Sequence, residues 1–172
     1  MKGSHFFGCA PVAHLFVLGE DMMRSYSVAF IGHRRIEREF DLVDRIEGLV
    51  SELLKQHEYV EFLVGRNGDF DIAAASAVKR AQARFGRENS SLNLVLPYHV
   101  KDEGFYADYY DTIVYPVPPD VHFKAAIKKR NEWMLGHANH LIAYVKIFSG
   151  GAYAALEYAR ARKTDFINLA YI

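Results

Sequence analysis

The chain contains three glycine-bearing turns with residue types that bind anions. They are Gly32-His33-Arg34, then Gly65-Arg66-Asn67-Gly68-Asp69, which Asp71 follows, and Ser149-Gly150-Gly151. Glycine lets the backbone approach a ligand closely, and an arginine can bind a phosphate through two parallel hydrogen bonds. A turn that opens a helix also leaves backbone N–H groups free for an anion. The three turns therefore predict a site for a phosphate or a similar anion.

Several side chains in and beside these turns have two interpretations. His33 titrates near neutral pH and is a candidate acid or base, or else it belongs to a solvated loop. Asp69 and Asp71 either face the ligand or cap the helix that follows. Tyr153 either stacks on a base or packs in the core, which is the commoner role of tyrosine.

Three further residues could complete the site from the two C-terminal helices. Arg130 and Asn131 stand late in the helix expected over residues 122–135, and Glu157 stands in the last helix. Arg130 and Glu157 could flank a ligand that binds at the diglycine turn. Alternatively, Arg130 is a cation that the helix dipole stabilises, and Glu157 is a solvated surface residue.

The motifs of several other chemistries are absent from the sequence. The glycine spacing differs from the dinucleotide fingerprint Gly-x-Gly-x-x-Gly and from the P-loop, which requires Gly-Lys-Ser/Thr. The chain has no His-Glu-x-x-His pair and no clustered metal-ligand spacing, and it lacks the nucleophile elbow Gly-x-Ser-x-Gly. We therefore expect neither a metal site nor a cofactor.

An alternation of strands and helices must hold these turns. Short apolar runs predict strands over residues 26–31, 60–64, 92–96, 112–115, 141–145 and 166–170. Helical periodicity predicts helices over residues 39–56, 72–85, 122–135 and 152–162.

Short apolar strands separated by helices are typical of a parallel sheet that is covered on both faces. The sequence thus predicts an α/β protein with a Rossmann-like, doubly wound, mainly parallel sheet flanked by helices on both faces. In such sheets ligands bind outside the carboxyl ends of the strands, near the point where the strand order reverses. Because the three turns follow strands, we expect them to converge on one edge of the sheet.

The composition indicates one globular domain. Of 172 residues, 51% are hydrophobic and 24% are charged, which argues against disorder. Lysines and arginines number 21, as do aspartates and glutamates, so the formal net charge is zero and nucleic acid is disfavoured as a partner. Cys9 is the only cysteine, which excludes an internal disulfide and favours a cytoplasmic location.

The first residues do not resemble the rest of the chain. The apolar run over residues 5–18 is interrupted by Pro11 and His14, is too short to span a membrane and lacks the features of a secretory signal. We expect residues 1–24 to be a poorly ordered leader. Alternatively, the start is mis-assigned and the protein begins at Met22 or Met23. Residues 25–172 then form the domain, and no membrane is expected as a partner.

A cluster of aromatic side chains lies just before the fourth predicted strand and at its end. These residues are Phe105, Tyr106, Tyr109, Tyr110 and Tyr115. Aromatic rings can stack on bases, but they also cover sheets and fill interfaces between copies of a chain. We favour the last two roles, so the sequence leaves a homo-oligomer open.

The order of the turns resembles the SLOG superfamily, the Rossmann-like group named after Smf/DprA and the plant lonely guy enzymes. The resemblance covers residues 26–172 and is closest to small single-domain bacterial and phage-associated members, many of them uncharacterised. Its elements are the Gly-His-Arg turn, a Gly-x-x-Gly-x-x-Asp turn, an Arg-Asn-x-x-Met helix and the Gly-Gly turn. It implies a SLOG-type domain that binds a nucleotide.

The lonely guy enzymes cleave the N-glycosidic bond of nucleoside monophosphates, and their motifs match part of this chain. Their Pro-Gly-Gly-x-Gly-Thr-x-x-Glu motif is similar to residues 149–157, which keep the diglycine and Glu157. Ser149, Tyr153 and Ala154 replace the proline, the third glycine and the threonine. The Arg-Lys-x-x-Met helix of the family is similar to residues 130–134, with Asn131 in place of the lysine.

Three functional hypotheses follow from the residues and the resemblance. The leading one is a nucleotide or nucleotide-derivative binding protein, either a sensor or a processing protein, with a small nucleotide-like ligand as partner. The second is an N-glycosidic phosphoribohydrolase, for which the resemblance implies Glu157 and Arg130 as catalytic residues. Glu157 would stabilise the positive charge that develops on the ribose, and Arg130 would hold the 5′-phosphate or polarise the leaving base. The third is a single-stranded DNA-binding accessory protein of the DprA type.

Overall fold

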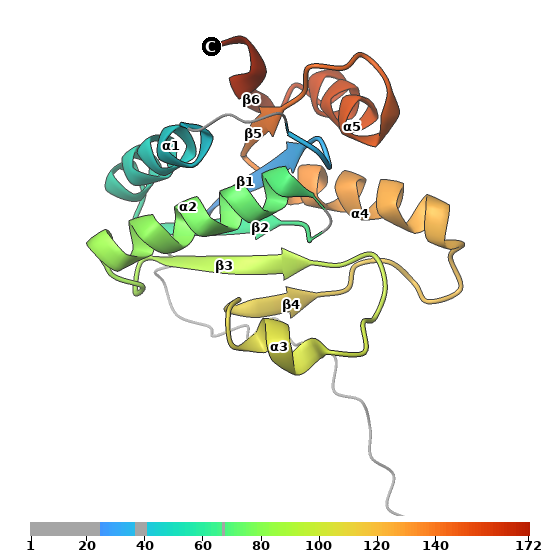
Figure 1. The fold of residues 1–172 in the computed structure, drawn as a ribbon, viewed down its shortest axis with the longest axis horizontal. Coiled ribbons are helices and arrows are strands. Elements are labelled where there is room, and N and C mark those ends of the chain that lie inside the picture. Colours follow the sequence, from blue (N-terminus) through green and yellow to red (C-terminus); the bar gives the residue numbers. More distant parts are fainter. Residues whose placement is uncertain (1–24, 37–40, 67) are drawn as a thin grey trace, which may run out of the picture.

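The structure, a computed structural model, describes residues 25–36, 41–66 and 68–172, in which strands alternate with helices (Figure 1). The strands are β1 (Ser25–Gly32), β2 (Tyr59–Val64), β3 (Ser90–Val95), β4 (Thr112–Val114), β5 (His140–Tyr144) and β6 (Asp165–Asn168). The helices are α1 (Leu42–Gln56), α2 (Asp69–Phe85), α3 (Glu103–Ala107), α4 (Phe123–His137) and α5 (Gly150–Ala161), with a short 3-10 helix, η1 (Leu169–Tyr171), after β6.

All strands belong to one sheet in the order β4-β3-β2-β1-β5-β6, and every neighbouring pair is parallel. The order runs outward in one direction from β1 to β4 and in the other from β5 to β6. It therefore reverses between β1 and β5, where Gly32 is paired with Tyr144 at the carboxyl ends of the two strands. This is the doubly wound topology, and its ligand position lies at that reversal.

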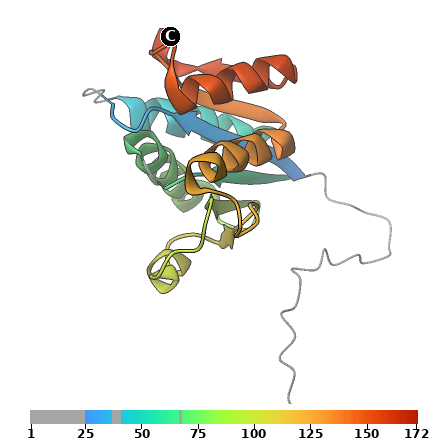
Figure 2. The ribbon, with the colours of Figure 1, turned by 90° about the vertical axis from the view of Figure 1, so that its right-hand side faces the viewer.

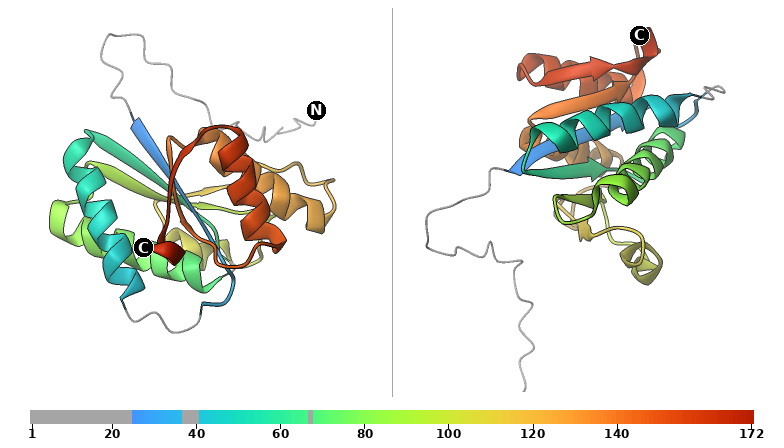
Figure 3. Two further views of the ribbon diagram at one scale, coloured as in Figure 1. Left: turned by 90° about the horizontal axis from the view of Figure 1, so that it is seen from above. Right: turned by 90° about the vertical axis from the view of Figure 1, so that its left-hand side faces the viewer.

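Helices cover both faces of the sheet, as Figure 3 shows in two views. On one face, α1 and α2 pack on a core that includes Phe30, Phe62 and Phe70. On the other face, α4 and α5 pack through Met134 and Leu156 on a second core. The predicted fold class, a Rossmann-like sheet with helices on both sides, is confirmed.

The structure differs from the prediction at two places. Helix α3 lies beside the edge strand β4, at the opposite end of the sheet from the C-terminus, in a segment where no helix was predicted (Figure 2). Strand β6 ends at Asn168, although the apolar run predicted a strand to residue 170. The Asn168 side chain accepts hydrogen bonds from the backbone N–H of Val145 and of Ala170, which turns the chain into η1.

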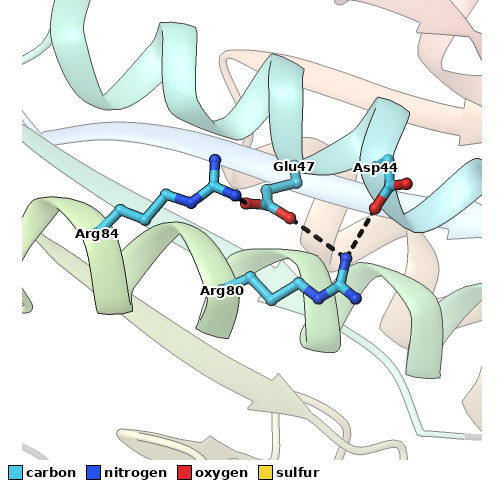
Figure 4. A network of polar contacts seen from close by, with 4 residues as sticks. All are labelled: Asp44, Glu47, Arg80 and Arg84. Atoms are coloured by element: carbon cyan, nitrogen blue, oxygen red, sulfur yellow. Dashed lines mark hydrogen bonds and ion pairs between the residues drawn. The ribbon is translucent and has the colours of Figure 1, made fainter.

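An ion-pair network joins α1 to α2 (Figure 4). Glu47 of α1 is buried, with a side chain only 7% exposed, and its carboxylate lies 3.4 Å from Arg80 and 3.1 Å from Arg84 of α2. Arg80 also binds the exposed Asp44 at 2.7 Å. The network holds α2 against α1, and α2 begins just after the carboxyl end of β2.

Two predictions concern residues outside the described part of the chain. These are the leader over residues 1–24 and the site residue Asn67. Over the residues that the structure does describe, no helix has the length and apolar character needed to cross a membrane. Across the same residues, no group of three or more histidine, cysteine, aspartate or glutamate side chains could hold a metal ion.

Candidate ligand-binding cleft

A cleft of about 240 Å³ opens at the point where the strand order reverses. It is bounded by the loop after β1, by the first turns of α2 and α5, and by α4. The structure brings most of the predicted site residues together along its wall. They are Gly32, His33, Arg34, Gly68, Asp71, Arg130, Asn131, Ser149, Gly150 and Gly151.

Two helices begin at this cleft. Helix α2 starts after Gly68 and α5 starts after Ser149, and neither N-cap residue makes a side-chain capping hydrogen bond. Gly150 has φ of +82°, in the left-handed region, which favours glycine at this position. The positive ends of two helix dipoles therefore face one cavity, an arrangement that favours an anion.

Arg130 supplies a buried positive charge in the wall of the cleft. The residue is 6% exposed, its Nη1 contacts Met134 Sδ at 3.5 Å, and its Nε has no hydrogen-bond partner among the described residues. Burial lowers the pKa of the guanidinium, while the neighbouring Asp71 carboxylate raises it. Since arginine keeps its proton in proteins, the wall of the cleft contains a buried cation.

Two glycines permit close packing at the cleft. A Cβ added at Gly65 would overlap Nη1 of Arg130 and would lie 2.9 Å from the Asp71 carboxylate. Gly65 therefore lies under the guanidinium. A Cβ at Gly32 would overlap the Phe70 ring of α2. Gly32 thus serves the packing of α2 on the sheet, in addition to lining the cleft.

Asn131 contributes a second unused polar group. The residue is 9% exposed and lines the cleft, and its Oδ1 has no hydrogen-bond partner within the described part of the chain. Buried polar atoms without partners are rare in proteins and costly to maintain.

His33 has a structural contact in the cleft. Its Nε2 accepts hydrogen bonds from the backbone N–H of Lys146 and of Ile147, and burial lowers the pKa of the imidazole. Accepting at Nε2 requires the neutral ring. The lone pair that a general base would use is therefore engaged with the loop between β5 and α5.

Glu157 and Tyr153 do not line the cleft. The Glu157 side chain is 46% exposed and binds Arg160 at 2.7 Å, so the structure does not join it to Arg130 in one site. Its position in α5 places it on the solvent side of that helix. The Tyr153 ring meets the Phe148 ring edge-on at 5.8 Å and packs against the core beneath α5.

Arg66 and Asp69 are also engaged elsewhere. Arg66 donates a hydrogen bond to the Tyr106 hydroxyl at 2.8 Å and lies over the Tyr106 ring. The Asp69 carboxylate accepts from the backbone N–H of Ile36 at 3.0 Å. Both residues hold loops around the cleft and do not form its wall.

Sequence reasoning missed cavity residues on α4 and α5. Ile127 and Ala152 line the cleft, and Lys124, Lys128 and Tyr158 line a neighbouring groove. The signal was present in the helical spacing, because Lys124, Ile127 and Lys128 precede Asn131 by seven, four and three positions and therefore share its side of α4.

Comparisons with known proteins show resemblance at the level of structure. No protein-family model matches the chain, and no curated protein matches it in sequence. The DNA processing protein A (DprA) from Streptococcus pneumoniae matches with a TM-score of 0.61 and 17% identity, over 84% of this chain and 50% of that one. The chain thus spans about half the length of that protein.

Two further solved structures match with similar scores. The DNA processing protein A from Helicobacter pylori, described by its single-stranded DNA binding mode, has a TM-score of 0.58 and 15% identity, over 82% of this chain and 63% of that one. The molybdenum cofactor carrier protein from Chlamydomonas reinhardtii has a TM-score of 0.54 and 14% identity, over 86% of this chain and 78% of that one. These matches show a shared fold. The expectation that nucleic acid is disfavoured as a partner finds no support among these matches.

Proposed function

We propose that the protein binds a nucleotide or a nucleotide derivative, with the phosphate of the ligand in the cleft. The single observation that carries the proposal is Arg130, a buried cation whose side chain lines the cavity. A buried cation is stabilised by an anion that enters the cavity beside it. Membership of the SLOG superfamily is part of the same proposal.

The surroundings of Arg130 fit a ligand with a phosphate better than a ligand with only a carboxylate. A phosphate presents oxygens in several directions, and here the donors come from α4, from the start of α5 at Gly150 and Gly151, and from the loop at Arg34. The dipoles of α2 and α5 add positive potential from two sides. Asp71 offsets part of the positive charge and so limits the affinity for inorganic anions.

Calorimetric titration tests the proposal with nucleoside monophosphates, nucleoside diphosphates and ADP-ribose as probes. We expect at least one of these to bind to the wild-type protein, and Arg130→Gln to weaken that binding by roughly tenfold or more, because a charge-assisted hydrogen bond is lost. Arg160→Gln is the matched control, since Arg160 lies on α5 with an exposed side chain outside the cleft. A wild-type protein that binds none of the probes would overturn the proposal.

Binding of single-stranded DNA is a second candidate function. It is supported by the Helicobacter pylori neighbour and by exposed aromatic residues around α3, among them Phe105 and Tyr109. Lys79 and Arg66 lie over the rings of Tyr109 and Tyr106 and add positive charge there. Bases stack on such rings next to a basic surface.

Fluorescence anisotropy with an oligothymidine tests the second candidate. Binding should weaken as salt rises, because phosphate contacts release counterions. Phe105→Ala should weaken it further, whereas Phe123→Ala, at an exposed aromatic residue at the start of α4, should not. A signal that does not respond to salt, or no signal, would exclude this function.

A further inference from the structure

A groove between α4 and α5 lies beside the cleft, and its inner wall is apolar. The groove has a volume of about 380 Å³. Ile127 forms this wall on α4, and Ala154, Ala155 and Tyr158 form it on α5. Because three of its α5 neighbours in the wall are small or lie at the helix start, the two helices leave an apolar space between them. An apolar group that displaces water from such a space binds favourably.

The groove is long and has a smooth floor on α5. Its lining residues run from Lys124 to Glu132 on α4 and from Gly150 to Tyr158 on α5, eight positions on each helix. Eight positions rise about 12 Å along an α-helix, which is the length of an extended chain of roughly eight to ten carbon atoms. Before Tyr158, the α5 positions that line the groove are all glycine or alanine, namely Gly150, Gly151, Ala154 and Ala155. This shape fits an unbranched chain.

Lysines of α4 give the groove a positive rim. Lys124 and Lys128 both line it with exposed residues, and they lie four positions apart on the same side of the helix. Glu132 lies 3.7 Å from Lys128 and offsets its charge. Lys124 has no ion-pair partner among the residues that the structure describes. The rim therefore offers one uncompensated positive charge, which matches the single negative charge of a carboxylate.

We infer that the groove binds an unbranched carboxylate of medium chain length, with its acyl chain between Ile127 and Ala154 and its carboxylate beside Lys124. The apolar chain then leaves water while the charged group stays solvated at the rim. The inference goes beyond the proposed function and does not depend on it, because the groove site uses Lys124 and not Arg130. The two sites are neighbours that share wall residues, namely Ile127, Asn131, Gly150 and Gly151.

A chain-length series tests the apolar part of this site. Calorimetry titrates the wild-type protein with straight-chain carboxylates from butanoate to dodecanoate. Each added methylene should tighten binding by roughly threefold to fourfold while it is buried in the groove. Beyond roughly eight to ten carbon atoms the gain should stop, because the chain is then longer than the groove. No binding, or an affinity that keeps rising to dodecanoate, would overturn the inference.

Filling the groove should abolish much of this binding. Ala154 lines the groove at an exposed position, so Ala154→Phe introduces a ring there without entering the core. We expect it to weaken octanoate binding by roughly tenfold. Ala161→Phe, at an exposed position at the end of the same helix, is the matched control and should change nothing. Equal effects of the two variants would contradict a site in the groove.

Removing the charge tests the position of the carboxylate. Lys124→Gln should weaken octanoate binding by roughly threefold, as expected for an exposed ion pair, and leave the uncharged 1-octanol unaffected. Lys129→Gln is the matched control, since Lys129 is an exposed lysine of α4 that does not line the groove. A loss of octanoate affinity in Lys129→Gln equal to that in Lys124→Gln would show a general charge effect and overturn the assignment of the carboxylate.

Arg130→Gln separates the groove from the proposed function. It should weaken nucleotide binding and leave octanoate affinity within about twofold. Loss of octanoate binding in Arg130→Gln would place the carboxylate in the cleft and overturn the groove site. A protein that binds octanoate but no nucleotide keeps the groove site and loses the proposed function, and the reverse result does the opposite. A wild-type dimer in sedimentation that binds no octanoate and that Ala154→Phe dissociates would show a second copy in the groove, which also overturns the inference.

Discussion

The imidazole of His33 accepts a hydrogen bond from the backbone N–H of Lys146, with 2.9 Å between Nε2 and N. The same nitrogen accepts from Ile147 at 3.1 Å. The loop after β1 is thereby tied to the loop after β5, across the reversal of the strand order. Because residues 146–147 lead directly into Ser149 and α5, His33 helps to set the position of one wall of the cleft.

We expect acid to loosen this wall. A protonated imidazole donates from Nε2 and cannot accept, so both hydrogen bonds are lost on protonation. Burial lowers the pKa of His33 from its ordinary 6.5, so the contribution to stability is present above that value and is lost as the pH falls through the lowered pKa of the folded state. Nucleotide affinity, measured by calorimetry from about pH 7.5 to about pH 5.5, should fall over the acid part of this range.

A glutamine at position 33 provides the control for this pH dependence. Its amide oxygen can accept a hydrogen bond but does not titrate, so His33→Gln should flatten the acid loss of affinity. His137→Gln removes an exposed histidine at the end of α4 and should leave the pH dependence as it is. An unchanged pH profile in His33→Gln would show that another group causes the loss.

Gly65→Ala should weaken ligand binding through Arg130. The added methyl group would overlap Nη1 of the guanidinium, which must move, and we expect affinity for the nucleotide to fall by roughly tenfold. Gly48→Ala is the contrasting variant, since no atom lies within 4 Å of a Cβ at this helical position. It should leave affinity unchanged and raise the free energy of unfolding by about 0.5–1 kcal/mol in urea titrations. If the two variants bind the nucleotide with similar affinity, Gly65 does not contribute to the binding site.

The Glu47 network should respond asymmetrically to substitution. Arg80→Met with Arg84→Met leaves a buried carboxylate without a cation, whereas Glu47→Met leaves two largely exposed arginines that water can solvate. We expect the double arginine variant to lose about 2–3 kcal/mol of unfolding free energy in urea and Glu47→Met to lose less. Asp44→Ala, at an exposed carboxylate, should change stability by under about 0.5 kcal/mol. A larger loss in Glu47→Met would contradict this account.

The fold could be predicted because the strands are buried on both faces. Runs such as residues 62–64 and 141–145 are apolar without interruption, a pattern that indicates a covered parallel sheet. The convergence of the glycine-bearing turns then follows from topology alone, since each turn follows the carboxyl end of a strand. Helix α3 was missed because it is only five residues long and has no buried side chain, so it lacks an apolar period.

The individual roles in the site depend on contacts that spacing does not encode. Glu157 matches a family motif in sequence position, yet it pairs with Arg160 on the exposed side of α5. Asp69 and Asp71 are two positions apart, which on a helix points them in different directions: Asp69 holds the loop at Ile36, and Asp71 lines the cleft. The sequence predicted which segments meet, and side-chain direction decided which residues line the cleft.

The position of Glu157 leads to a prediction about N-glycosidic cleavage. Cleavage of the base from a nucleoside monophosphate develops positive charge on the ribose, which a carboxylate inside the cleft stabilises. Asp71 is the carboxylate that lines the cleft, whereas Glu157 lines neither the cleft nor the groove. We therefore expect Glu157→Gln to leave nucleotide affinity within about twofold of wild type.

Chromatography can measure the free base that is released from nucleoside monophosphates. Comparing the variants shows which carboxylate, Glu157 or Asp71, the reaction requires. Release by the wild-type protein that persists in Glu157→Gln and is lost in Asp71→Asn would place the reaction in the cleft beside Arg130. Loss in Glu157→Gln with retention in Asp71→Asn would contradict the geometry, because it requires α5 to turn an exposed, ion-paired side chain toward the ligand. Nucleotide binding without any release would leave a binding protein in which Asp71 moderates the charge of Arg130.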